Sequence, residues 1–184
     1  KRKHFQCIMK HTWIEFKKLY DNEQTARLAF SDMCDHLITL QYPEFAVAKS
    51  ADILENTTSL EYLSPGRLPV VYLPKFFTDH ISNSRKGQIR KAFNENLNFL
   101  QFNSVKEWIL LLPKQFSSEE ASWWTNWTTR IAEEFQIKAI LYDSDGIFAL
   151  LEKFGLLGEY FPDEKSNAVM PQSKKSNIEL EDTD

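Results

Sequence analysis

Apolar residues recur along this chain with two different periods, and the alternation between them predicts an α/β fold. Spacings of three and four residues predict helices, which we place at 12–20, 22–41, 78–100, 117–135 and 146–154. Short apolar runs bounded by Pro or polar residues predict strands, which we place at 57–63, 68–77, 105–112 and 137–142. Because strands and helices alternate in the second half, we expect partly parallel pairing through right-handed crossovers.

The stretch 57–77 predicts a β-hairpin followed by a helix. Its two β-rich runs are joined by Ser64-Pro65-Gly66-Arg67, in which Pro presets the first central turn residue and Gly supplies the positive φ of a type II turn. A hairpin contributes an antiparallel pair, whereas the later strands are expected to be parallel. The sequence therefore predicts a mixed central sheet flanked by helices.

Composition and charge limit the organisation and the location. With 184 residues, 42% of them hydrophobic, the chain can bury one core. We expect a basic N-terminal extension over 1–11, one domain over 12–161 and a disordered polar tail over 162–184. The net charge is −4, but residues 163–184 hold six acids and three lysines, so the remainder is nearly neutral and can present a basic face. No long apolar run or signal peptide is present, which predicts a cytoplasmic chain without membrane contact.

Several segments together resemble one family. These are a Trp-containing first helix, AFSDMCDHLI in the second, a hairpin that ends in PKFF, and then NSRKGQIRKAF, EWILLLP, SSEEASWW and LLEKFGLLGEYF. In this pattern, from Trp13 to Phe161, the chain resembles the PD-(D/E)XK, or restriction-endonuclease-like, domains attached to bacterial antiphage defence proteins. The resemblance implies a mixed sheet with helices on both faces, DNA as a partner, and contact with other domains or subunits of a defence complex.

The resemblance also implies a site on the hairpin. The family pairs an acid on one strand with an acid or Gln two residues before a Lys on the other, so Glu61 would be the first acid and metal ligand, and Lys75 the lysine. Such carboxylates hold Mg²⁺, which activates a water molecule, while the lysine orients that water or stabilises developing charge. Here Leu73 stands at the second ligand position, where an apolar side chain offers no lone pair. We therefore expect a nuclease fold with a degenerate, inactive site.

The predicted helix after the hairpin offers candidate DNA contacts. Its first half carries Arg85, Lys86, Arg90 and Lys91, where the helix dipole disfavours cations, and such a local cost often marks an anion site. An equally weighted interpretation is a solvated face whose charges pair with acids elsewhere. Arg67 in the turn would extend a phosphate track.

An aromatic stripe follows a capping box at Ser117 and Glu120. Trp123, Trp124 and Trp127 share one side of the predicted helix. Aromatic residues at helical spacing more often pack in a core than stack on bases, so we predict a core role.

Three hypotheses from different classes remain. The first, which we prefer, is a degenerate nuclease-like domain that binds DNA without cutting it. The second is an active Mg²⁺-dependent endonuclease with a displaced carboxylate, for which Asp52, Glu55 and Asp32 are candidates. The third is a structural module that contacts other proteins in a larger assembly.

Overall fold

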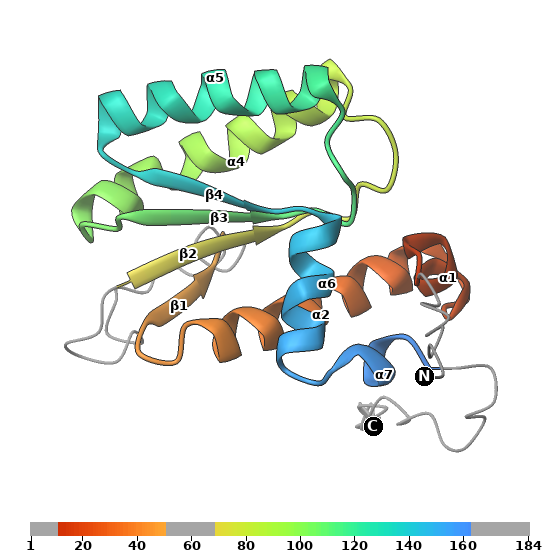
Figure 1. The fold of residues 1–184 in the computed structure, drawn as a ribbon. Coiled ribbons are helices and arrows are strands. Elements are labelled where there is room, and N and C mark those ends of the chain that lie inside the picture. Colours follow the sequence, from red (N-terminus) through yellow and green to blue (C-terminus); the bar gives the residue numbers. More distant parts are fainter. Residues whose placement is uncertain (1–10, 51–68, 163–184) are drawn as a thin grey trace, which may run out of the picture.

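The computed structural model describes residues 11–50 and 69–162, which form a four-stranded sheet flanked by helices (Figure 1). The strands are β1 (Ala46–Lys49), β2 (Pro69–Pro74), β3 (Glu107–Leu111) and β4 (Lys138–Tyr142). They lie side by side in sequence order, and all three neighbouring pairs are parallel. The predicted α/β class is confirmed.

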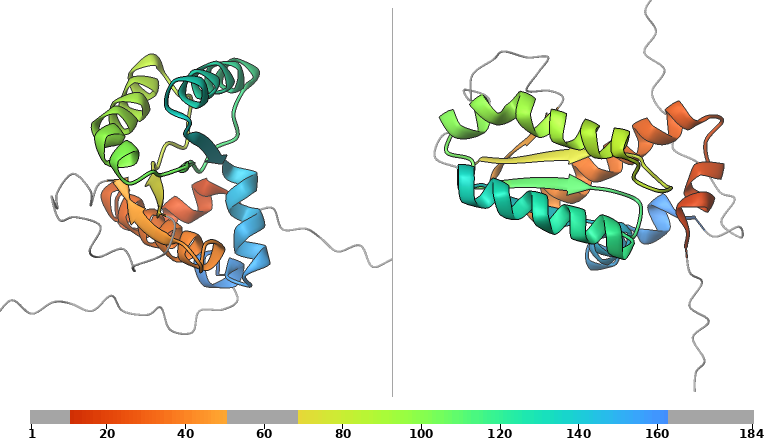
Figure 2. Two further views of the ribbon diagram at one scale, coloured as in Figure 1. Left: turned by 90° about the vertical axis from the view of Figure 1, so that its left-hand side faces the viewer. Right: turned by 90° about the horizontal axis from the view of Figure 1, so that it is seen from above.

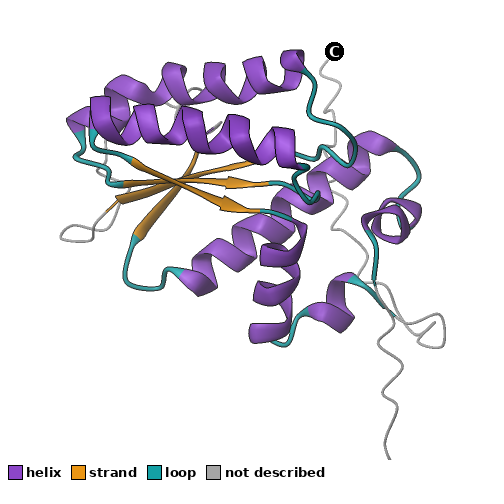
Figure 3. Ribbon diagram, turned by 45° about the horizontal axis from the view of Figure 1, so that its top comes forward, coloured by secondary structure: helices purple, strands orange, loops and turns teal. Residues whose placement is uncertain are grey.

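The helices form a layer on each face of the sheet. They are α1 (Trp13–Lys18), α2 (Glu23–Gln41), α4 (Asn83–Phe102), α5 (Ser118–Phe135), α6 (Ser144–Lys153) and α7 (Leu157–Tyr160). Helices α4 and α5 cover one face, whereas α2 and α6 cover the other, with α1 and α7 beside them (Figures 2 and 3). Within the described ranges, no helix combines the length and the apolar character needed to cross a membrane.

The prediction of a mixed sheet is wrong for the four described strands, which are all parallel. The physical reason is that α4 links β2 to β3 and α5 links β3 to β4, and each such crossover returns the chain to the same end of the sheet. The predicted first hairpin strand at 57–63 and its turn lie outside the described residues. The run predicted as its second strand does form a strand, β2, but β2 pairs in parallel with β1 on one edge and with β3 on the other, which leaves no edge for an antiparallel hairpin partner over Val70–Tyr72.

The central strands are buried on both faces, which explains their nearly continuous apolar sequences. Val70 and Tyr72 of β2 pack in the cluster under α2 and α6, whereas Val71 and Leu73 pack in the cluster under α4 and α5. The register places Leu73 beside Leu110, and Leu110 beside Leu141. A row of three leucines therefore crosses the sheet on the α4/α5 face near the carboxyl ends of the strands.

Side-chain caps set where the helices begin. Ser117 and Glu120 form the predicted capping box of α5. Helix α4 begins at Asn83 rather than near residue 78, because Ser82 caps it by accepting from the backbone N–H of Arg85. The cap of α6 is Asp143, whereas the hydroxyl of the next residue, Ser144, accepts a 2.8 Å hydrogen bond from the indole N–H of Trp13.

Two phenylalanines of α4 test the packing of the α4/α5 layer. Phe93 is 1% exposed and meets Trp108 and Trp127 edge to face, whereas Phe102, at the end of the same helix, is 89% exposed. We expect Phe93→Ala to lower the free energy of unfolding by about 3–5 kcal/mol because it leaves a cavity. Phe102→Ala is the matched control and should leave urea denaturation nearly unchanged. Equal losses in the two variants would contradict this packing.

Candidate nucleic-acid interface

The carboxyl ends of β2, β3 and β4 meet at one edge of the sheet (Figure 1). Polar residues follow these strand ends in the sequence. Lys75 follows β2, Lys114 comes shortly after β3, and Asp143 follows β4. In parallel α/β sheets this edge is the usual place for ligands, because the strands themselves are covered by helices. The candidate site is therefore sought here.

Lys75 continues β2 by one residue and is half-buried. Its backbone N–H donates to the carbonyl of Leu111 at 3.0 Å, so the parallel ladder extends to this position. Burial lowers the pKa of its ammonium; the Glu95 carboxylate opposes this shift and the Arg27 guanidinium adds to it. In the part of the chain that the structure describes, no acid forms an ion pair with it. A half-buried cation without an ion-pair partner favours an anionic ligand.

Leu73 is 5% exposed and lies in the apolar cluster under α4 and α5. Its neighbours in the row, Leu110 and Leu141, belong to the same cluster or pack against it. No lone pair is available here for a cation. Across residues 11–50 and 69–162, no three His, Cys, Asp or Glu side chains gather closely enough to hold a metal ion.

The described structure does not bring the other proposed metal ligands, or the proposed phosphate contact Arg67, to Lys75. Glu61, Arg67, Asp52 and Glu55 lie outside the described residues. Asp32 is exposed on α2, and its charge acts on the hydroxyls of Tyr20 and Tyr160, whose pKa values are raised first by burial and then by nearby acids.

The four cations of α4 do not form one anion site. Arg85 pairs with Asp79, donates to the carbonyl of His80 and lies over the ring of Phe77. Lys86 is 6% exposed, and its ammonium lies 3.4 Å from Glu119 and over the ring of Trp123.

The remaining two cations of α4 face solvent. Lys91 pairs with Glu95 at 3.5 Å, and Arg90 is exposed. The interpretation as internally paired charges fits Arg85, Lys86 and Lys91, which leaves Arg90 as the residue of this set best placed to reach a phosphate.

Sequence analysis identified Glu120 only as a helix cap, but in the structure it joins three segments of this edge. Its carboxylate is fully buried and accepts from the backbone N–H groups of Ile81 and Ser117 and from the ammonium of Lys114, at 2.7–2.8 Å. The ring of His80 lies 3.1 Å away. Burial would raise the pKa of Glu120, but the hydrogen bonds from Lys114, Ile81 and Ser117 outweigh it and lower the pKa to about 2.

The Glu120 contacts fix the entrance of α4 to the entrance of α5. Ile81 precedes α4, whereas Lys114 and Ser117 precede α5, and the sequence separation of these partners concealed the contact. The capping-box pattern was the one visible indication. The loops that follow β2 and β3 are thus held rigidly beside Lys75.

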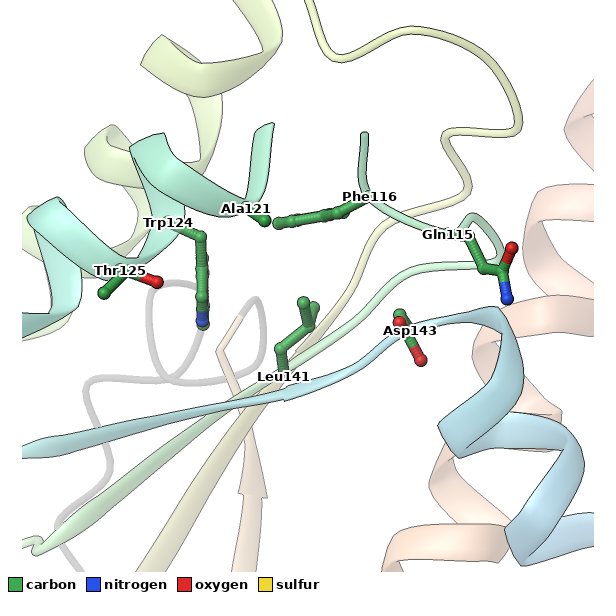
Figure 4. Close-up of a pocket in the computed structure, with 7 residues that line it drawn as sticks. All are labelled: Gln115, Phe116, Ala121, Trp124, Thr125, Leu141 and Asp143. Atoms are coloured by element: carbon green, nitrogen blue, oxygen red, sulfur yellow. The ribbon is translucent and has the colours of Figure 1, made fainter. Parts of the chain in front are cut away.

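A hollow opens on the other flank of the same edge, between α5 and β4. Its volume is about 460 Å³, and Figure 4 shows Phe116 above it, Leu141 below it, Trp124 at one end, and Gln115 and Asp143 at the other (Figure 4). Trp127 is buried in the core as predicted, but Trp124 is only half-buried and lines this hollow. Helical periodicity places both tryptophans on one side and does not reveal which of them remains accessible.

Comparisons with protein families, with curated proteins and with solved structures find no match to this chain.

The Glu120 contacts make a prediction for stability. Glu120→Gln keeps the capping reach of the side chain but removes its charge, so we expect the free energy of unfolding at neutral pH to fall by about 3 kcal/mol, because Lys114 loses its buried partner. Glu133→Gln, on an exposed position of the same helix, is the matched control and should change little.

The same residue predicts an acid dependence. A carboxylate whose folded pKa is about 2, below its ordinary 4.5, stabilises the fold above pH 4.5 and loses that contribution as the pH falls from 4.5 towards 2. The unfolding free energy of the wild type should decline through this interval, by about 2 kcal/mol more than that of Glu120→Gln. Parallel pH profiles from urea denaturation would contradict the assignment.

Proposed function

We propose that this chain is a degenerate, nuclease-like DNA-binding domain that grips the phosphodiester backbone with Lys75 and does not cleave it. The observation that carries the proposal is the half-buried ammonium of Lys75, with no ion-pair partner among the described residues, at the carboxyl end of a central parallel strand. A phosphate oxygen would offset the desolvation that now disfavours its charge. Arg90 is exposed on α4 and would add a second backbone contact.

The absence of cleavage follows from Leu73. Cleavage through Mg²⁺ needs carboxylate or other oxygen ligands around the cation, and the position two residues before Lys75 points into the apolar cluster under α4 and α5. A polar side chain at this position would have to be buried against α4. The fold therefore supports phosphate binding without metal chemistry.

The resemblance to PD-(D/E)XK domains supplies the larger setting of the proposal. Lys75 and the sequence around it match that pattern, but the two edges of β2 are occupied over Val70–Tyr72 by the parallel strands β1 and β3, so β2 does not offer the antiparallel hairpin that the pattern requires. By the same resemblance, the domain would act as the nucleic-acid module of an antiphage defence system, together with other domains or subunits.

A second candidate function is a protein-interaction module. Ile14 on α1 and Leu28 on α2 are large apolar side chains that are 68% and 56% exposed. In that case the exposed apolar residues would carry the partner contact, and Lys75 would contribute nothing to it.

A DNA-binding assay separates these functions. We expect a labelled duplex to bind with an affinity that falls as salt rises, and Lys75→Met to reduce the slope of log affinity against log salt by about 1, because one phosphate contact is lost. Lys106→Met is the matched control, since Lys106 is exposed just before β3, at the opposite end of the sheet.

Incubation of plasmid with Mg²⁺ or Mn²⁺ should give no cleavage. Cleavage that disappears in Glu61→Ala and in Lys75→Ala would instead establish an active endonuclease with a displaced ligand. The absence of salt-sensitive DNA binding would favour the interaction module.

The lowered pKa of Lys75 predicts how binding responds to pH. The ammonium must be protonated to hold phosphate, so DNA affinity should begin to fall at a pH below the ordinary lysine value of 10.5. Lys75→Arg keeps its charge throughout this range and should bind with a flatter profile. Identical profiles for the wild type and Lys75→Arg in fluorescence anisotropy would exclude Lys75 from the phosphate contact.

A further inference from the structure

The hollow between α5 and β4 has the shape and chemistry of a site for a flat ring. The rings of Phe116 and Trp124 stand at 81° to each other with centroids 6.2 Å apart, so they form two walls at right angles. The side chain of Leu141 rises from β4 towards them and closes the floor (Figure 4). A planar group can lie against one aromatic face and meet the other with its edge.

The polar end of the hollow accepts hydrogen bonds. Asp143 uses Oδ1 to accept from the backbone N–H of Gly146, at 3.0 Å, which leaves its second oxygen for a ligand. The amide nitrogen of Gln115 donates to Asp145, which leaves the amide oxygen of Gln115 as an acceptor. Two acceptors therefore lie at the same end of an otherwise apolar space.

Among the described residues that line the hollow, none is a cation. The nearest lysine in sequence, Lys114, directs its ammonium to Glu120 and to the carbonyl of Gln115, at 2.7 and 2.8 Å. The hollow is thus unsuited to an anionic ligand. It suits a ligand that carries adjacent N–H donors, which can reach the acceptors Asp143 and Gln115. Its volume of about 460 Å³ lies within the range of small-molecule sites and exceeds what a guanidinium group alone would fill.

We propose that this hollow binds a guanine base turned out of a single strand, with the ring against Trp124 and its adjacent ring N–H and amino donors on Asp143. Guanine is the nucleobase whose Watson–Crick edge presents two neighbouring donors, which match a carboxylate, and proteins read unpaired bases by aromatic stacking and hydrogen bonds to that edge. The ligand class rests on the proposed nucleic-acid function. The site itself lies on a different flank from Lys75.

The test measures the binding of three short labelled oligonucleotides. One contains thymidine alone, and the other two have a single central thymidine replaced by deoxyguanosine or by deoxyinosine. We expect the deoxyguanosine strand to bind the wild type about tenfold more tightly than the thymidine strand. Deoxyinosine, which lacks the exocyclic amino group, should lose part of that preference. Both Asp143→Asn, which retains a good helix cap, and Trp124→Ala should abolish the preference, whereas Glu133→Gln should keep it.

Lys75→Met separates this inference from the proposed function. This substitution should lower the affinity for the thymidine strand and for the deoxyguanosine strand by the same factor, so that the ratio of the two affinities stays unchanged. Binding of both strands with no preference in the wild type would overturn the guanine site and leave the proposed function standing. Failure of both strands and of the duplex to bind, with free guanosine still binding in an Asp143-dependent way, would overturn the function and support the site.

Two further results would also overturn the guanine site. One is binding of neither the strands nor free guanosine. The other is tighter competition by methylguanidine than by guanosine, which would identify the hollow as a pocket for an arginine side chain of a protein partner.

Discussion

Burial of the sheet on both faces is the constraint from which the rest of this structure follows. Helices α2 and α6 cover one face and α4 and α5 cover the other, so the buried positions of the central strands are apolar as far as their carboxyl ends. The leucine row at 73, 110 and 141 is a direct consequence. The first polar side chains after β2 and β4 are those of Lys75 and Asp143, which directly follow the last strand residues. Both candidate ligand contacts therefore lie at the same edge of the sheet.

The buried carboxylate of Glu120 gives that edge its shape. It binds backbone donors ahead of α4 and α5 and the ammonium of Lys114, so the two loops cannot move independently. It also pairs with the charge of Lys114, which directly precedes Gln115 of the hollow. The flank at Lys75 thus retains an ammonium with no described ion-pair partner, whereas the flank at Asp143 retains hydrogen-bond acceptors, and one edge offers two surfaces of opposite electrostatic character.

Much of the architecture could be predicted from periodicity and caps, because these depend on neighbouring residues. The second hairpin run, the two later strands and the capping box of α5 are found close to where they were placed. The parallel direction of all described strands was not foreseen, since it depends on how crossovers return across the sheet. The internal pairing of Arg85 and Lys86 was left open, because their partners lie in other segments.

The site was predicted unevenly for a similar reason. Lys75 and the apolar character of Leu73 were visible in the sequence. The hydrogen bonds from Ile81 and Lys114 to the carboxylate of Glu120 were not, because only the fold brings these distant loops together. The accessibility of Trp124 was not predicted, because an aromatic stripe identifies one side of a helix but not which of its residues other elements cover.

The central claim is that Lys75 meets a phosphate and no metal ion. Its most direct test follows the side-chain resonances of Lys75 by NMR, in protein with ¹³C-labelled lysine, during separate additions of a DNA duplex and of paramagnetic Mn²⁺. The account predicts that the Lys75 signal shifts with the duplex and stays sharp with Mn²⁺ alone. Broadening of that signal by Mn²⁺ alone, in the absence of DNA, would place a metal beside the ammonium and contradict the account.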